Sequence, residues 1–248
     1  MKAQVSTAAV ALAGAAALVA SAQGMAAPGA TVAQEGVPKI DQLVVFRSGA
    51  VVEKKVAAKR TMVKVGRRDC VVASATALAA LVRAKPGPIA YHDYGSCSRK
   101  PADSAGLFVK AMRGERNRAQ DGWVYKVGRK LATAGAADPS GSFGSGRLRS
   151  GDDVVWFYCR QLTSGTCQRS LEIDTAVDGD ELSVTVTGYD DAGDGTAVAG
   201  AAVRAGGERA TTDADGKATL SLERGRHAVY AAKKGTIRSF AKRVKIDG

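Results

Sequence analysis

An apolar N-terminal run followed by four cysteines constrains this 248-residue chain more than any other feature. Lys2 precedes a run of small apolar residues at 8–22, and both 20–22 and 24–26 offer the small residues that a signal peptidase accepts. The alternative is a membrane anchor, but the run is shorter than the roughly 20 residues that span a bilayer. We therefore predict a signal peptide at residues 1–26, a secreted, extracellular protein, and no membrane span after cleavage.

The cysteines all lie in the middle of the chain, at Cys70, Cys97, Cys159 and Cys167. In an oxidising compartment an even number of cysteines usually forms disulfides, and four cysteines allow three pairings. Residues 160–166 contain the turn formers Ser164-Gly165, so a hairpin would bring Cys159 within bridging distance of Cys167. We predict this bridge and, by remainder, Cys70 with Cys97. A zinc site is the weaker alternative, because no CxxC motif is present.

The positive charge is concentrated in one part of the chain. Residues 40–173 hold 23 Lys and Arg against 11 Asp and Glu, whereas residues 174–248 hold 11 against 12. Such a field attracts polyanions, so we expect an anionic cell-envelope polymer, a glycan or a surface protein as partner. Nucleic acid is disfavoured by location and by the few aromatic residues beside the basic ones. A solvated basic surface with no dedicated partner is the alternative.

Composition divides the rest of the chain into three parts. Residues 27–39 are rich in Ala, Gly and Pro and are predicted to be a flexible linker between the signal peptide and the first domain. We expect domains at 40–173 and 174–248. In the first, a helix is predicted to begin after Ser74 or Thr76, to present Leu78, Leu81 and Val82 on one face, and to end before Pro86. Strands are predicted at 61–65, 70–72, 106–112, 122–127, 153–159 and 169–173. The strand at 153–159 is apolar on both faces and should be central.

Two segments of this domain resemble a known family. Gly122-Trp123-Val124-Tyr125-Lys126-Val127 and the later Leu148-Arg149-Ser150-Gly151-Asp152-Asp153-Val154-Val155-Trp156-Phe157-Tyr158 resemble the paired signature of the transcobalamin-like C-terminal domain family. The resemblance implies a β-grasp-like fold. It departs from the family where Val127-Gly128-Arg129 replaces V-N-G, although Gly128 can still adopt positive φ. Cobalamin is a candidate ligand by resemblance alone, and we expect no cofactor because the helical domain that forms the other half of that site has no counterpart here.

The tail shows a different pattern. Short strands are predicted at 182–186, 198–203, 218–222, 227–232 and 237–246, which indicates a small antiparallel sandwich. Residues 198–203 and 211–220 resemble bacterial immunoglobulin-like and carboxypeptidase-regulatory-like modules. The expected fold class is therefore α+β, a β-grasp-like domain with one main helix followed by a small all-β immunoglobulin-like sandwich. Asp190, Asp191, Asp194, Asp213 and Asp215 suggest calcium or, as we favour, β-turns in which Asp accepts backbone amides.

Four aromatic residues are the candidate ligand-binding residues: Trp123, Tyr125, Trp156 and Tyr158. Each pair shares one face of its strand, so neighbouring strands would gather the rings into one patch. That patch is either core or a platform for a flat or sugar-like ligand.

Catalysis has little support in the sequence. His92 and His227 fall in different predicted domains and belong to no metal or catalytic motif, so we predict no enzyme, no catalytic residues and no metal. Two functions remain. One is a secreted non-catalytic module whose basic domain engages an anionic or glycan extracellular partner; the other is a structural cell-surface scaffold or adhesion protein without a small-molecule ligand. Cobalamin binding is a third and weaker hypothesis.

Overall fold

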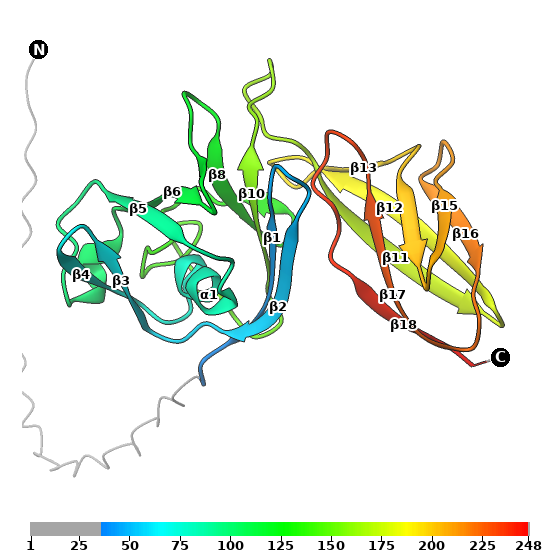
Figure 1. Cartoon of the computed structure of the whole chain (residues 1–248), viewed down its shortest axis with the longest axis horizontal. Helices are drawn as coiled ribbons and strands as arrows, with labels where there is room; N and C mark the ends of the chain where they lie inside the picture. The colour runs from blue at the N-terminus through cyan, green and yellow to red at the C-terminus, as the bar shows by residue number, and fades with distance from the viewer. Residues whose placement is uncertain (1–35, 248) are drawn as a thin grey trace, which may run out of the picture. The chain divides into compact units, whose positions relative to one another are not determined.

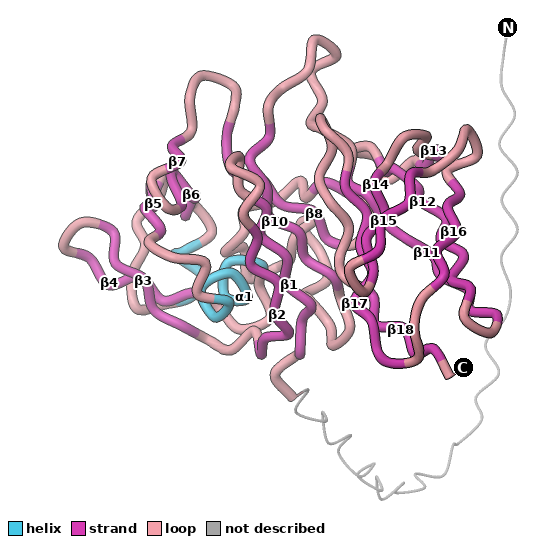
Figure 2. Tube along the Cα trace, turned by 45° about the vertical axis from the view of Figure 1, so that its right-hand side comes forward, coloured by secondary structure: helices cyan, strands magenta, loops and turns pink. Residues whose placement is uncertain are grey.

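The computed structural model describes residues 36–247. This part of the chain contains eighteen strands and a single α-helix, with one 3-10 turn at Pro101–Ser104, and Figure 2 shows strands throughout it. The predicted signal peptide and most of the predicted linker lie outside the described residues. None of the helices described is long and apolar enough to cross a membrane.

The predicted fold class is wrong. The described chain is mostly β and is divided among several small sheets, so it is neither a β-grasp domain with a main helix nor such a domain with a separate immunoglobulin-like sandwich. The helix, α1 (Ala77–Ala84), has 8 residues and is too short to cover a sheet. Much of the difference between the expected α+β fold and the observed β structure comes from strands that were not predicted. In addition, the tail covers one face of the largest sheet.

The largest sheet has five strands in the order β2-β1-β10-β8-β9. Its strands are β1 (Lys39–Val45), β2 (Val51–Ala57), β8 (Gly122–Val127), β9 (Lys130–Leu131) and β10 (Asp153–Cys159). β1 and β10 run parallel, and the other neighbours are antiparallel. β10 occupies the middle, which confirms the expected central strand. Val154, Trp156 and Tyr158 enter one core, while Val155 and Phe157 enter another on the opposite face.

β1 was not predicted because a polar residue stands at its centre. Gln42 is fully buried, and its Nε2 donates to the carbonyl oxygens of Val154 at 3.1 Å and Leu43 at 3.2 Å. These two bonds satisfy the amide nitrogen, whereas the buried Oε1 of Gln42 has no hydrogen-bond partner among the described residues. The tertiary position of Gln42, and not its polarity, therefore decides that this segment is an interior strand.

Smaller elements surround one face of this sheet. They are the hairpin β3 (Thr61–Val65) and β4 (Arg68–Val72), then β5 (Ile89–Asp93), β6 (Leu107–Met112) and β7 (Glu115–Arg116). The helix α1 begins as predicted, because the Thr76 hydroxyl accepts a bond from the amide of Ala79, and it ends at Lys85 in the left-handed region. Figure 1 shows α1 beside β1 and β2, where Leu78 and Leu81 are fully buried.

The remaining strands form two four-stranded sheets that share one apolar core (Figure 1). One contains β11 (Ser170–Asp178), β12 (Glu181–Tyr189), β13 (Gly195–Ala197) and β16 (Lys217–Ser221). The other contains β14 (Ala202–Ala205), β15 (Glu208–Thr211), β17 (Gly225–Ala232) and β18 (Lys242–Ile246). The predicted domain boundary between residues 173 and 174 falls inside β11.

Residues of the tail also cover the second face of the five-stranded sheet. Ile237, with Phe240 against it, joins Leu43, Val155 and Phe157 in a third apolar cluster. Because β10 is apolar on both sides, its second face requires a cover that excludes water. The segment between β17 and β18 supplies that cover, so the two halves of the described chain share buried surface.

Both predicted disulfides are confirmed, Cys70–Cys97 and Cys159–Cys167. Asp93 holds the turn before Cys97, because its carboxylate accepts the amides of Cys97 at 2.9 Å and Gly95 at 3.0 Å and pairs with Arg68 at 3.0 Å. Burial alone would raise the pKa of Asp93, but these amides and the guanidinium outweigh it and hold that pKa below its usual range.

Replacing Cys70 and Cys97 together with alanine should lower the free energy of unfolding by about 3 kcal/mol, because the bridge restricts the unfolded chain. Urea denaturation followed by circular dichroism measures the change, with Ser96→Ala in the same loop as control. An unchanged midpoint in the double variant would contradict a stabilising role for this bridge.

Candidate functional site: a basic groove

The four candidate aromatic residues lie together on neighbouring strands. Trp156 is opposite Tyr125 and Tyr158 is opposite Trp123 in the β8–β10 pair. The first pair is stacked with ring centroids 5.0 Å apart, and the second meets edge to face at 5.9 Å. All four side chains are buried, the most exposed being Tyr125 at 6%. The rings are therefore part of the core, and their role in ligand binding stays a prediction.

The polar atoms of these rings are mostly satisfied within the protein. Trp123 Nε1 donates to the carbonyl of Glu115 at 2.9 Å, and the hydroxyl of Tyr125 donates to Ala134 at 3.0 Å. Burial raises the pKa of Tyr125 to about 12. Trp156 Nε1 is buried and has no hydrogen-bond partner among the described residues.

A separate groove gathers positive charge. It has a volume of about 290 Å³ and lies where the β1–β2 turn, the end of β10 and the segment after β17 come together. Its lining contains five basic residues and no Asp, Glu, His or Cys. The basic residues are Arg47, Arg160, Lys233, Lys234 and Arg238, and we refer to this feature as the basic groove.

The five cations differ in how they are engaged. Arg238 pairs with Glu53 at 2.9 Å, and Lys233 Nζ donates to the carbonyl of Ala199 at 2.6 Å. The guanidinium of Arg47 lies 4.9 Å from the centroid of the Tyr158 ring, which forms part of the groove wall. Arg160 and Lys234 form no ion pair within residues 36–247. Four of the five charges are therefore not neutralised by a carboxylate of the described chain.

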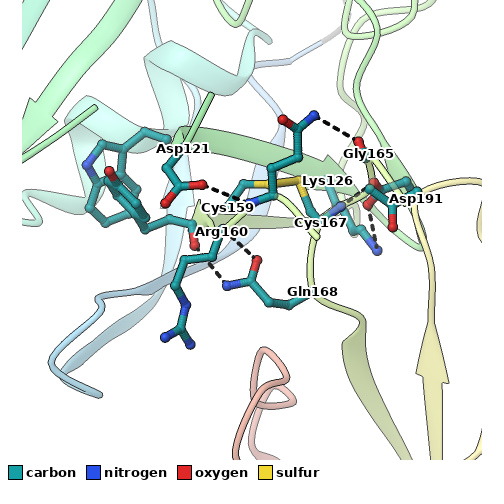
Figure 3. The surroundings of a disulfide bond; sticks show 12 residues. Asp121, Lys126, Cys159, Arg160, Gly165, Cys167, Gln168 and Asp191 are labelled. Atoms are coloured by element: carbon teal, nitrogen blue, oxygen red, sulfur yellow. Dashed lines mark hydrogen bonds and ion pairs between the residues drawn. A yellow bond between two sulfur atoms is a disulfide. The ribbon is translucent and has the colours of Figure 1, made fainter. Parts of the chain in front are cut away.

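The Cys159–Cys167 disulfide places Arg160 at the groove. Gln168 fixes the end of β10 beside it, because its Oε1 accepts the amide of Arg160 at 3.0 Å and its Nε2 donates to the carbonyl of Tyr158 at 3.3 Å. The next amide, of Gln161, donates to Asp121 at 2.9 Å. Figure 3 shows the Arg160 guanidinium pointing away from the disulfide and from these bonds. The backbone is thus fixed while the charged group stays available.

Lys126 lies on the other side of the same disulfide (Figure 3) and is fully buried. Its ammonium donates to the Ser170 hydroxyl at 3.2 Å and to the carbonyls of Tyr189 at 2.9 Å and Asp190 at 2.7 Å. Asp191 lies 3.9 Å from it and also accepts the amide of Cys167 at 2.8 Å. Burial lowers the pKa of Lys126 from 10.5 to about 8, and the carboxylate of Asp191 opposes part of that shift.

The acidic turns of the tail use their own carboxylates. Asp190 Oδ1 accepts the amides of Ala192 at 3.0 Å and Asp194 at 2.9 Å, and Asp213 Oδ1 accepts those of Asp215 at 2.9 Å and Lys217 at 2.8 Å. These bonds are the ones expected of Asp in a β-turn. They give Asp190 and Asp213 the structural role that the β-turn interpretation expects, and calcium binding stays an untested alternative.

The basic groove was not predicted from the sequence. Arg47 and Arg160 lie in the strongly basic block, but Lys233, Lys234 and Arg238 come from the tail, whose net charge is near zero. The pair Lys233-Lys234 before Gly235 is a local signal that a count over the whole tail conceals. The third apolar cluster, through Ile237, and the contacts of Arg238 and Ala241 with Glu53 bring that segment to the five-stranded sheet.

No protein-family model, no curated protein and no solved structure matches this chain. The resemblances to the transcobalamin-like and immunoglobulin-like families therefore stay predictions from the residues.

The buried Lys126 predicts a specific dependence of stability on pH. Between pH 8 and pH 10.5 the unfolded chain holds a proton on Lys126 that the folded chain has lost, so the free energy of unfolding should rise with pH, by up to about 3 kcal/mol. Lys126→Met should lack this rise, whereas Lys110→Met, which changes an exposed residue of β6, should keep it. Urea denaturation at intervals across this range measures the difference, and parallel curves for all three proteins would contradict the depressed pKa.

Proposed function

We propose that this protein is a secreted, non-catalytic binding module that holds an anionic extracellular polymer in its basic groove. The observation that carries the proposal is the lining of that groove, where five Lys and Arg residues meet without an acidic one. A protein would not hold like charges together without cost, because their mutual repulsion opposes folding. An anionic partner would offset this repulsion when it binds in the groove.

The types of cation favour carboxylate, sulfate or phosphate groups as the bound chemistry. Arg47 and Arg160 each offer a planar fork that can form two parallel bonds to such a group. Lys233 and Lys234 add more compact charges on the opposite wall. The aromatic ring of Tyr158 beneath Arg47 fixes one guanidinium in place, which reduces the entropy lost on binding.

Charge beyond the groove supports the same partner. The chain carries a formal net charge of +12, and the excess resides in residues 40–173, which supply Arg47 and Arg160. A field of this sign raises the rate at which a polyanion meets the surface, and salt screens it over a Debye length of roughly 8 Å at physiological ionic strength. Binding should therefore weaken steeply as salt increases.

The composition of the groove supports binding without catalysis. General acid–base and nucleophilic chemistry most often uses His, Asp, Glu or Cys side chains within hydrogen-bond reach of the substrate. None of these residue types lines the groove. A scaffold without a ligand is the competing function, and it predicts that the groove cations can be removed with no effect on polyanion binding.

Neutralising two groove cations tests the proposal. Arg160→Gln with Lys234→Gln should weaken binding to dextran sulfate or polyphosphate about tenfold at low salt, because two contacts of about 1 kcal/mol or less each are lost. Fluorescence anisotropy with labelled polymer measures the affinity. The matched control is Lys110→Gln with Arg209→Gln, which removes the same charges from exposed positions outside the groove. Equal losses in both double variants would mean that net charge alone attracts the polymer, and the groove would no longer be the site.

Glu53→Gln tests the groove by increasing its unpaired positive charge. Glu53 neutralises Arg238 and also accepts the amide of Ala241 at 2.8 Å. Glutamine keeps an acceptor for that amide but leaves Arg238 unpaired, so affinity for the polymer should rise about two- to fivefold. Glu172→Gln is the control, because it removes a carboxylate paired with Arg129 outside the groove lining. Weaker or unchanged binding by the Glu53 variant relative to this control would count against the groove.

A further inference from the structure

An apolar cavity lies on the aromatic face of the five-stranded sheet, away from the residues of the basic groove. Its volume is about 140 Å³. The walls come from β6, β8, β10 and the segment after β9. The cavity and the basic groove share no lining residue, so the cavity is a second feature that the proposed function does not use.

The lining is apolar and uncharged. It includes Trp123, Tyr125 and Trp156, together with aliphatic residues of β6 and of residues 131–136, and no Lys, Arg, Asp, Glu or His. The hydroxyl of Tyr125 and Nε1 of Trp123 already donate to backbone carbonyls, and Nε1 of Trp156 is covered by protein. A ligand in this space therefore gains from burial of hydrocarbon and not from hydrogen bonds to these side chains.

A cluster of exposed aromatic side chains lies next to the cavity wall. Phe108 lines the cavity and is 42% exposed, and Tyr94, its neighbour at 6.2 Å between ring centroids, is 76% exposed. His92 lies 4.2 Å from Tyr94. Phe108 stands between Leu107 and Val109, which are buried and line the cavity, so its ring lies on the outer face of the strand that forms the cavity wall. An exposed aromatic cluster therefore lies directly outside this wall.

We propose that this cavity binds an uncharged single-ring or short branched hydrocarbon group. The volume sets the class, because a protein cavity of about 150 Å³ lined by apolar side chains stays dry and takes up benzene. A fused or macrocyclic ring system, including a corrinoid, is too large for it. Empty, the walls lack contact partners on one side and lose dispersion energy, which an apolar ring would restore.

The two tryptophans make the test direct. The chain contains only two, and both line the cavity, so tryptophan fluorescence, excited without the tyrosines, reports on this site. Titration of the full chain with toluene should give a saturable fluorescence change and a rise in the thermal midpoint. Benzylamine, which carries the same ring with a positive charge that the basic groove also repels, should give neither. An absent or non-saturable response to toluene would overturn the proposal.

Filling the cavity supplies the matched variants. Ala132→Leu and Ala134→Leu each add a side chain at the wall and should weaken toluene binding at least tenfold, while Ala57→Leu on β2, outside the lining, should leave it unchanged. Circular dichroism serves as the folding check, since it requires neither ligand. Unaltered toluene binding in a folded, filled variant would place the ligand elsewhere and refute the cavity site.

Discussion

The buried ammonium of Lys126 is the constraint on which the rest of the structure depends. Its three hydrogen-bond acceptors lie on β11 and at the end of β12, whereas Lys126 itself lies on β8. Pulling β8 away from those strands would leave a charge in the interior without partners, which costs several kcal/mol. The two halves of the described chain are therefore held in register by a polar group, and the apolar cluster around Ile237 closes over the same contact.

The apolar cavity and the basic groove occupy different parts of the five-stranded sheet. On one face, α1 and the smaller hairpins bury the four aromatic side chains and leave the apolar cavity beside Phe108. On the other face, the segment between β17 and β18 brings its cations to the end of β10. Tyr158 is the residue that connects them: its ring packs on Trp123 in the core and lies beneath Arg47 at the groove. A hydrocarbon site and an anion site can thus share one sheet, because β10 presents Trp156 to the cavity and Tyr158, on the same face but nearer the end of the strand, to the groove.

Local chemistry predicted several parts of this arrangement. The start of α1 near Ser74 or Thr76, its end at Lys85, the Cys159–Cys167 bridge and the central place of β10 follow from residues close together in the sequence. The Cys70–Cys97 bridge follows by remainder. The fold class was wrong for a related reason. The prediction of an α+β fold relied on one helix that is short in the structure, while Gln42 concealed β1. One of the two acceptors of the Gln42 amide nitrogen is the carbonyl of Val154, over a hundred residues away. A local sequence pattern does not show that a buried polar side chain is hydrogen-bonded by a residue far away in the chain.

The sequence by itself determined which cysteines pair, where the single described helix begins and ends, and where positive charge is concentrated. Each of these depends on neighbouring residues or on simple counts. Only the tertiary structure decided that Arg47, Arg160 and Lys233 line one groove, that Lys126 is buried, and that both tryptophans face one cavity. The physical reason is that burial and electrostatic interaction depend on separations of a few ångströms in space, and such separations between distant parts of a chain are set by packing.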